Sequence, residues 1–380
     1  MTTKKLLILG GYGSTGRCLA DLLLQESDVE LVLAGRNQGK AQALAAKLND
    51  KYGGERVYHL RLDASDPQSL HHSYDGIDMV VVASSTAEFT EQVAGAALEA
   101  GIDYFDVLYS TRKFDALDAM ASNIKVAGRC FVTDGGFHPG LPAALIRYLA
   151  PRFDKLESAR VGSVIKFDWN NLDLSPSTME EFVAEFIDFQ TLEFKEGHWV
   201  KSSALSMMLP KYIDFSCDIG PDFGRQYAIP MFLEEMRAIP ELYPGITDTS
   251  FLVGGFNWFV DWFVSPIIMV ALKLWPQRAL PSMGRLMFWG LRKFGKPPFG
   301  TLLKAEARGL KDGKPASIDL FLYHDDGYMF TAVPAAACLL QLLDGSERKP
   351  GLWLQAHIVD PERMMIDMER MGIHSQLRSG

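Results

Sequence analysis

Residues 5–16 read KLLILGGYGSTG, and this stretch decides the fold. Lys5–Leu9 is a short apolar run typical of a buried strand, and Arg17–Gln25 carries leucines spaced as on one face of a helix. The glycines between them satisfy G-x-G-x-x-G, which permits a tight turn and lets backbone N–H groups approach a pyrophosphate. The alternative is a glycine turn that binds nothing. The predicted dinucleotide contacts are Gly10, Gly11, Gly13, Ser14, Thr15 and Gly16.

The residues that follow alternate between short β-rich runs and helix-compatible stretches. The expected strands are Lys5–Leu9, Glu30–Ala34, Val57–Leu62, Asp78–Ala83, Tyr104–Val107 and one near Cys130–Thr133. The expected helices between them are Arg17–Gln25, Gln38–Asn49 and Phe89–Ala100. Since parallel neighbours need a crossover connection, this alternation predicts βαβ units and a parallel sheet.

The pattern changes after Pro151. A strand is expected at Arg160–Trp169, a helix at Ser177–Phe189 and an antiparallel meander at Leu303–Val333. We therefore predict the α/β class, with an N-terminal Rossmann doubly wound parallel sheet and a second α+β domain containing a mainly antiparallel sheet. The predicted domains are residues 1–134 for dinucleotide binding and 135–333 for substrate and dimerisation. C-terminal helices, about 334–380, are candidates for return to the first domain.

Composition excludes several classes of protein. The 380 residues are 48% apolar and 22% charged, which is ordinary for a globular chain, and the net charge of −9 argues against nucleic-acid binding. The four cysteines form no CxxC pair, so neither a disulfide framework nor a metal site is expected. The run after Lys5 is too short for a secretory signal, and Asp261 interrupts the apolar stretch Phe251–Trp275. A cytoplasmic location is expected.

The end of the second strand indicates which dinucleotide binds. NAD-preferring folds usually have an acid about 20 residues after the last glycine of the motif, and this chain has Arg36 there, followed by Asn37. A guanidinium can pair with the 2′-phosphate of NADP, so NADP is the predicted cofactor. Asp63 is a candidate for the adenine amine or for a helix cap. Ser84 and Ser85 are candidates for cofactor contact or for simple packing.

Several motifs carry a family resemblance. The chain has LILGGYGSTGR, LAGRN, AALEAGIDYFDV and DGGFHPGLP, then FGRQYAIP and IPELYPGI in its second half. With these it resembles the saccharopine dehydrogenase family of NADP-binding oxidoreductases. The resemblance implies a Rossmann domain, an α+β second domain and a substrate cleft. One departure is His138, where saccharopine-type members usually carry Asp, and it argues against an amino-acid substrate.

Three residues are candidates for catalysis. Tyr104 and Asp106 lie at the carboxyl end of a predicted strand, where open α/β sheets bind ligands. Tyr104 could equally be a core residue, and Asp106 could cap the next helix. His138 lies in a Gly/Pro-rich loop and, titrating near neutrality, suits a general acid; its alternative is a backbone contact. Asp134 could orient His138 or bind substrate.

The segment Phe251–Phe299 stands apart from the rest of this acidic chain. Between Trp262 and Ala305 it has seven bases and no acid. It could form a core helix and a homodimer surface, or an interfacial helix that contacts lipid or an apolar small-molecule substrate. The leading hypothesis is an NADP-dependent oxidoreductase that transfers hydride to or from a C=N, C=O or activated C=C bond. The alternative is a non-catalytic NADP-sensing or membrane-peripheral binding protein.

Overall fold

A computed structural model describes residues 3–171, 179, 182–183, 186–187, 190–201, 211–254 and 256–380. Contacts between Cα atoms divide the chain into two compact units. Unit 1 comprises Met1–Ala144 and Tyr328–Gly372, and unit 2 comprises Leu145–Gly327 and Ile373–Gly380. The helix expected at Ser177–Phe189 lies mostly outside the described residues.

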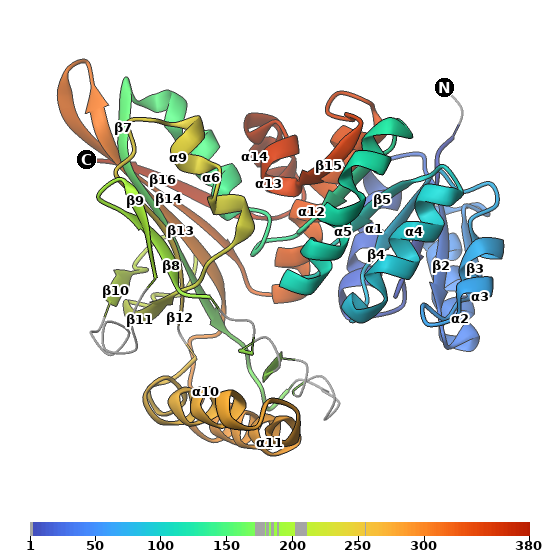
Figure 1. Cartoon of the computed structure of the whole chain (residues 1–380), viewed down its shortest axis with the longest axis horizontal. Helices are drawn as coiled ribbons and strands as arrows, with labels where there is room; N and C mark the ends of the chain where they lie inside the picture. Colours follow the sequence, from blue (N-terminus) through green and yellow to red (C-terminus); the bar gives the residue numbers. More distant parts are fainter. Residues whose placement is uncertain are drawn as a thin grey trace. The chain divides into compact units, whose positions relative to one another are not determined.

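Unit 1 is built on a seven-stranded sheet with the order β15-β6-β5-β4-β1-β2-β3, and all its pairings are parallel (Figure 1). Its strands are β1 (Lys5–Leu9), β2 (Glu30–Gly35), β3 (Val57–Arg61), β4 (Met79–Val82), β5 (Asp103–Asp106), β6 (Cys130–Thr133) and β15 (Gly351–Leu354). The doubly wound parallel sheet is therefore confirmed. The seventh strand, β15, comes from the C-terminal part of the chain.

Helices flank these strands in the chain, and those between two strands of the sheet make the crossovers that parallel pairing requires. The helices are α1 (Ser14–Glu26), α2 (Gln38–Tyr52), α3 (Pro67–Ser73), α4 (Thr90–Glu99), α5 (Thr111–Val126), α6 (Pro142–Leu149), α12 (Gly327–Leu343), α13 (Gln355–Ile358) and α14 (Pro361–Arg370). Side-chain oxygens at Asn37, Asp66, Ser110 and Asp360 accept backbone N–H groups at the starts of α2, α3, α5 and α14. One core cluster of unit 1 includes Leu7, Val80, Val82, Leu117 and Phe131.

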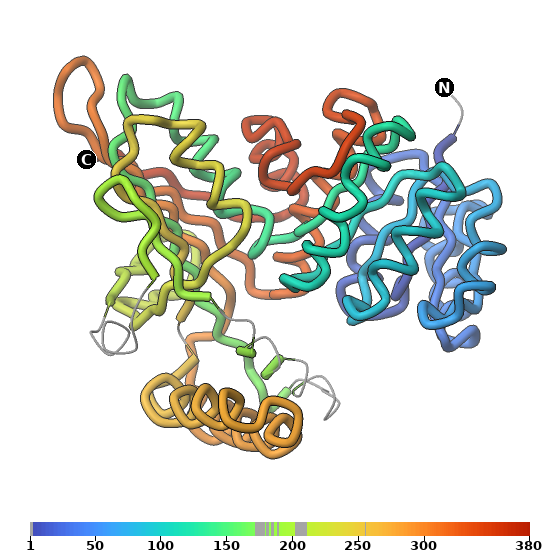
Figure 2. The backbone as a smooth tube through the Cα atoms, viewed as in Figure 1, coloured from blue at the N-terminus to red at the C-terminus, as the bar shows by residue number. Residues whose placement is uncertain are grey.

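Unit 2 contains a nine-stranded, mainly antiparallel sheet, as expected. Its strands are β7 (Lys155–Lys166), β8 (Leu192–Lys195), β9 (His198–Lys201), β10 (Lys211–Asp214), β11 (Arg225–Pro230), β12 (Asp248–Gly254), β13 (Gly300–Lys311), β14 (Lys314–His324) and β16 (His374–Ser379). Within the described strands of this second sheet, only the pairing of β7 with β12 is parallel. The tube in Figure 2 shows β16, the last strand in the chain, beside β14.

The meander expected at Leu303–Val333 is only half right. Lys311–Lys314 does close the β13–β14 hairpin, but the second Asp-Asp-Gly does not turn into another strand. There α12 begins at Gly327, because the apolar run that follows is long enough for a helix rather than a strand.

The helices within the described parts of unit 2 are α9 (Ile239–Leu242), the π-helix η4 (Val260–Val264), α10 (Ser265–Leu274), α11 (Pro276–Phe294) and the 3₁₀ turns η2 (Ala150–Arg152) and η3 (Glu234–Met236).

A buried carboxylate joins β5 and β6 to the C-terminal segment of unit 1. Arg348 donates to both oxygens of Asp103, Nε to Oδ2 at 2.6 Å and Nη2 to Oδ1 at 2.9 Å. The backbone N–H of Cys130 also donates to Oδ1, at 3.0 Å. This bidentate pair holds the segment that leads into β15 against the sheet.

Arg348→Met should therefore lower the free energy of unfolding by about 2–3 kcal/mol, because the buried Asp103 carboxylate loses its charged donor. Urea denaturation measures the change. Lys349→Met is the matched control, since its ion pair with Glu347 is exposed and should change stability by less than about 0.5 kcal/mol. Equal losses of stability in Arg348→Met and Lys349→Met would show that the pair of Arg348 with Asp103 does not stabilise the fold.

Candidate functional site

The glycine turn lies where β1 ends and α1 begins. Gly10 has φ +82°, and a Cβ built there would lie 2.6 Å from Cβ of Ser84, which follows β4. A Cβ at Gly16 would run into the carbonyl of Gly10, so the start of α1 packs directly on the turn. Ser14 is exposed and Thr15 half-buried in the first turn of the helix. The backbone N–H groups of that turn are therefore available to an anion.

The end of β2 carries the residues predicted for the adenosine half of the cofactor. Arg36 is exposed, and among the described residues no carboxylate lies within ion-pair distance of it. Asn37 serves as N-cap of α2, its Oδ1 accepting the N–H of Lys40 at 3.0 Å. The backbone N–H of Asn37 donates to the hydroxyl of Tyr12 at 2.9 Å. The Tyr12 ring covers Gly35, where any Cβ would come within 2.7 Å of it.

Asp63, after β3, forms a local turn. Its Oδ1 accepts the backbone N–H of Ser65 at 3.0 Å and the Ser65 hydroxyl at 2.8 Å. These hydrogen bonds lower the pKa of Asp63, and the charge of Arg36 adds to the effect. The cap of α3 is Asp66, whose carboxylate accepts the N–H of Gln68, so the helix-cap alternative for Asp63 is wrong. After β4, Ser84 Oγ lies 3.0 Å from Thr86 Oγ1, and Ser85 is exposed.

A buried ion cluster lies at the carboxyl ends of β5 and β6. Lys113 Nζ, from α5, is 2.7 Å from Asp106 Oδ1 and 2.6 Å from Asp134 Oδ1, and its side chain is fully buried. The hydroxyl of Thr133 donates to Asp106 Oδ2 at 2.8 Å. Nζ of Lys113 also donates to the carbonyl of Leu108 at 2.5 Å. We call Asp106, Lys113 and Asp134 the ion cluster.

The charges of the ion cluster decide its behaviour with pH. Burial alone would lower the pKa of Lys113, but the carboxylates of Asp106 and Asp134 raise it above its ordinary value. The contribution of Lys113 to stability is therefore fully present below the ordinary lysine pKa and is lost only as pH rises through the raised one. Asp134 has φ 58°, a left-handed conformation that is costly outside glycine, and its contact with Lys113 helps to hold it there.

Tyr104 lies in the core of unit 1. It is 1% exposed, and its ring stacks on Phe131 with the centroids 5.3 Å apart. Burial raises the pKa of Tyr104 well above its ordinary value, and the nearby charge of Asp106 raises it further. The phenol is therefore neutral throughout the physiological range. Its position on the same strand face as Asp106 agrees with the spacing of the two residues.

His138 lies in the loop between β6 and α6. The side chain of Gln355, the first residue of α13, holds this loop: its Oε1 accepts from Gly136 N at 3.2 Å and its Nε2 donates to Gly136 O at 3.0 Å. The imidazole makes an edge contact with Phe137, with ring centroids 4.0 Å apart. Burial lowers the pKa of His138 to about 4. The expectation that His138 titrates near neutrality is therefore corrected: it is neutral at pH 7.

Three residues of this site escaped the sequence analysis: Tyr12, Lys113 and Gln355. Tyr12 lies inside the glycine motif at a position that the motif leaves open. Lys113 is in an unremarkable polar stretch, and a lysine is normally a surface residue. The available signal was that Lys113 lies in the first turn of the helix that follows a strand ending in Asp106. Gln355 lies more than two hundred residues from the loop it holds, so no local pattern could reveal it.

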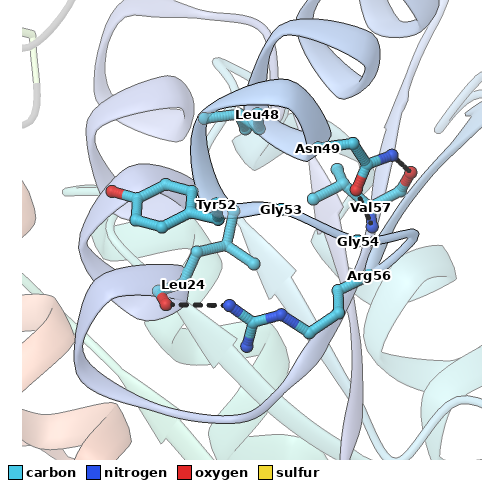
Figure 3. A pocket seen from close by; sticks show the side chains of 8 residues that line it. All are labelled: Leu24, Leu48, Asn49, Tyr52, Gly53, Gly54, Arg56 and Val57. Atoms are coloured by element: carbon cyan, nitrogen blue, oxygen red, sulfur yellow. Dashed lines mark hydrogen bonds between the residues drawn. The ribbon is translucent and has the colours of Figure 1, made fainter.

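Two hollows are lined by residues other than the site residues named above. The first is lined by Leu24, Leu48, Asn49, Tyr52, Gly53, Gly54, Arg56 and Val57 (Figure 3). It encloses no space for a water molecule, and Arg56 closes it by donating to the carbonyl of Leu24 at 3.2 Å. The second, of about 460 Å³, lies in unit 2 between β7, β8, β12 and β13. Its charges largely pair with one another, as in Arg160 with Glu306 and Lys211 with Glu193.

The strand order, with a glycine turn and a helix N-terminus at the carboxyl end of the central strand β1, defines a Rossmann-type dinucleotide-binding protein. Residues 6–129 match the family model described as the saccharopine dehydrogenase NADP binding domain. Over these residues the chain is similar to the NADP-binding domain of saccharopine dehydrogenases, and its cofactor-binding domain is of the NADP type. Comparison with curated protein sequences gives no match.

Solved structures extend the likeness in fold to both units. Apo histidine-tagged saccharopine dehydrogenase (L-Glu forming) from Saccharomyces cerevisiae matches with a TM-score of 0.70 and 14% identity, over 99% of this chain and 100% of that chain. A dehydrogenase from Chromobacterium violaceum matches with a TM-score of 0.46 and 10% identity, over 98% and 94% of the two chains. At these low identities the likeness can show the fold and nothing more. Of the two TM-scores, only the value of 0.70 is high enough to show it.

Lys113→Met should lower the free energy of unfolding by about 3–5 kcal/mol, because two buried carboxylates then face each other without a counter-charge. Lys125→Met, an exposed lysine on the same helix, should change it by less than about 0.5 kcal/mol. Adding Asp134→Asn to Lys113→Met removes one of the carboxylates and should restore part of the loss. Urea denaturation of wild type, the two single variants and the double variant tests this. A double variant no more stable than Lys113→Met would show that repulsion between the two carboxylates does not cause the loss.

His138 should make stability depend on pH. Its folded pKa of about 4 lies below its ordinary value of 6.5, so unfolding takes up a proton between these two values. The free energy of unfolding should therefore fall as pH falls from 6.5 to 4, by about 3 kcal/mol from this group. His138→Gln should remove that part of the pH dependence, whereas His72→Gln, at an exposed histidine, should leave it in place. Parallel curves for His138→Gln and wild type would show that His138 is not buried as neutral imidazole.

Proposed function

We propose that this chain is an NADP-dependent oxidoreductase that transfers hydride between the cofactor and a small molecule with a C=N, C=O or activated C=C bond. The observation that carries the proposal is the combination, in one domain, of the glycine turn under α1 and an exposed guanidinium at the end of β2. The family of the domain and the dehydrogenase fold of both units support it. When bound, the cofactor would supply or accept the hydride.

Arg36 is proposed to hold the 2′-phosphate of NADP. No acid stands at the end of β2 to bind a ribose diol, and Arg36 is free of carboxylate partners within ion-pair distance among the described residues. Asp63 lies near enough for the charge of Arg36 to lower its pKa, so both face the same end of the sheet. We assign Asp63 to the adenine side, and Ser84 and Ser85 to the phosphate and nicotinamide ribose, where the turn and β4 meet.

The ion cluster is proposed to shape the nicotinamide end of the site. Asp106 already accepts hydrogen bonds from Lys113 and Thr133, so it is better suited to positioning than to proton transfer. Tyr104, packed on Phe131, would support the same strand end from the core. His138 is the proposed group for contact with substrate. As a neutral imidazole at pH 7 it could donate a hydrogen bond or pass on a proton, but it is not a standing cationic acid.

Replacing Arg36 tests the cofactor assignment. Arg36→Ala should weaken NADPH binding by about 1.5–3 kcal/mol, the scale of a charge-assisted hydrogen bond, and leave NADH binding nearly unchanged. Calorimetric titration with the two cofactors measures both. Lys47→Ala, an exposed lysine on α2, is the matched control for loss of a surface charge. If Arg36→Ala weakened NADH binding by the same amount, Arg36 would not be the residue that binds the 2′-phosphate.

Turnover separates an enzyme from an NADP-sensing protein. The absorbance of NADPH should fall in the presence of one class among imines, ketones or enones, and His138→Gln should reduce that rate while keeping NADPH affinity. If NADPH binds tightly but no class of acceptor oxidises it, and no alcohol or amine reduces NADP, the protein is a binding protein rather than an oxidoreductase. An unchanged rate in His138→Gln would mean that another group or solvent transfers the proton.

A further inference from the structure

The helices α10 and α11 form a hairpin in unit 2 that has a small core of its own. With η4 and Trp169 they enclose a cluster that includes Val260, Val264, Ile268, Leu272, Met287 and Leu291, all buried. Figure 1 shows α10 and α11 running alongside each other. From the last residue of η4 along α10, the buried residues 264, 268 and 272 recur every four positions, so a single stripe of this continuous helical segment faces the core.

A second apolar stripe of the same helical segment, η4 followed by α10, faces solvent. Phe263, Ile267, Val270 and Leu274 recur at intervals of four, three and four residues, and each is between 51% and 60% exposed. A helix that is apolar on both faces belongs inside a core or in contact with lipid. Only one of the two faces of α10 meets the core of the hairpin.

Aromatic rings extend this stripe. Trp258, Phe259, Phe263, Trp289 and Phe294 contact one another, with Phe259 and Phe294 stacked at 4.2 Å and Trp258 5.8 Å from Phe294. We call the exposed surface made by Trp258, Phe263, Ile267, Val270, Leu274, Trp275 and Trp289 the docking face. Eight of the fifteen large apolar side chains that are exposed in the described chain lie between residues 258 and 289. Such a concentration marks an interaction surface.

The charges on the hairpin indicate what the docking face meets. Its six exposed bases are Lys273, Arg278, Arg285, Arg292, Lys293 and Lys296. None has a carboxylate within ion-pair distance among the described residues, and the sequence has no acid from 262 to 305. The seventh base, Lys304, is buried and paired with Glu306 and Asp319. A two-fold dimer through this face would bring two sets of unpaired bases together, which costs free energy.

We propose that the docking face binds the surface of an anionic lipid membrane. Apolar side chains and tryptophans would enter the interface while the bases contact lipid phosphates, the arrangement of an interfacial amphipathic helix. The binding is peripheral, since no helix in the described parts of the chain has both the length and the apolarity to cross a membrane. This inference is independent of the proposed oxidoreductase activity, because the hairpin belongs to unit 2 and the cofactor residues to unit 1.

Vesicle sedimentation of the full-length protein tests the proposal. Wild type should bind phosphatidylcholine vesicles that contain phosphatidylserine, bind vesicles of phosphatidylcholine alone much more weakly, and be released as salt screens the charges. Ile267→Ser, Val270→Ser and Leu274→Ser combined should weaken binding by about tenfold or more. All three side chains are exposed, so the fold is kept. The control combines Val126→Ser and Ile366→Ser, exposed apolar residues outside the hairpin, and should bind as wild type does.

The bases are tested separately. Arg278→Gln with Arg285→Gln should weaken binding roughly twenty-five-fold, about fivefold for each base removed from an anionic surface. Lys47→Gln with Lys125→Gln removes two exposed bases from unit 1 and should have no effect. The affinity for NADPH, measured on the same preparations, should be unchanged in every hairpin variant, so failure here is distinct from failure of the cofactor assignment.

Two results would overturn the proposal. The first is a salt-resistant dimer that the triple serine variant dissociates and that shows no binding to vesicles, because a second copy would then cover the docking face. The second is a protein that remains monomeric and binds neither kind of vesicle. Sedimentation velocity, run with the vesicle measurements, distinguishes these results from the expected one.

Discussion

The ammonium group of Lys113 neutralises the charge that collects where β5 and β6 end. Both strands lead into carboxylates at the same edge of the parallel sheet, Asp106 as the last residue of β5 and Asp134 directly after β6. Two buried carboxylates so close would repel each other without a counter-charge. Lys113 comes from α5, the helix that joins the two strands. Its ion pairs with Asp106 and Asp134 therefore hold the ends of both strands to that helix. The strand ends and the loop after β6 depend on this contact.

The loop after β6 shows how far that dependence extends. Its first residue, Asp134, is held by Lys113, and the backbone N–H of Gly135 donates to the carbonyl of Asp106 at 2.8 Å. Gln355, the first residue of α13, then fixes Gly136 through two hydrogen bonds. Residues 134–136 are thus held by charge from one side and by an amide from the other. His138 follows in the same loop, and its burial there makes it neutral, which the residue type alone could not indicate.

Local patterns predicted most of unit 1, because short apolar strands, helical spacing and a glycine turn are encoded within a few residues. They predicted less where partners are distant in the chain. The strand β15 has four residues and pairs with β6 only after the chain returns, so nothing near residue 351 marks it as part of a parallel sheet. The burial of Lys113 was likewise hidden, since only the assembled sheet brings Asp106 and Asp134 to it. The turn at residues 325–327 was misassigned because the same residue types begin hairpins and helices.

The hairpin of α10 and α11 shows why sequence alone left two alternatives open there. Its aromatic and aliphatic content fits a core, while its bases and lack of acids fit a charged surface. Each alternative accounts for part of the segment, because the helix formed by η4 and α10 has two apolar stripes. Val264, Ile268 and Leu272 are buried in the core of the hairpin, whereas Ile267, Val270 and Leu274 are exposed. Spacing cannot show which stripe meets α11. Because one stripe packs into the core, the other leaves its apolar surface exposed on a hairpin whose exposed bases have no carboxylate partner among the described residues. The surface of an anionic membrane would accommodate both the apolar side chains and the bases.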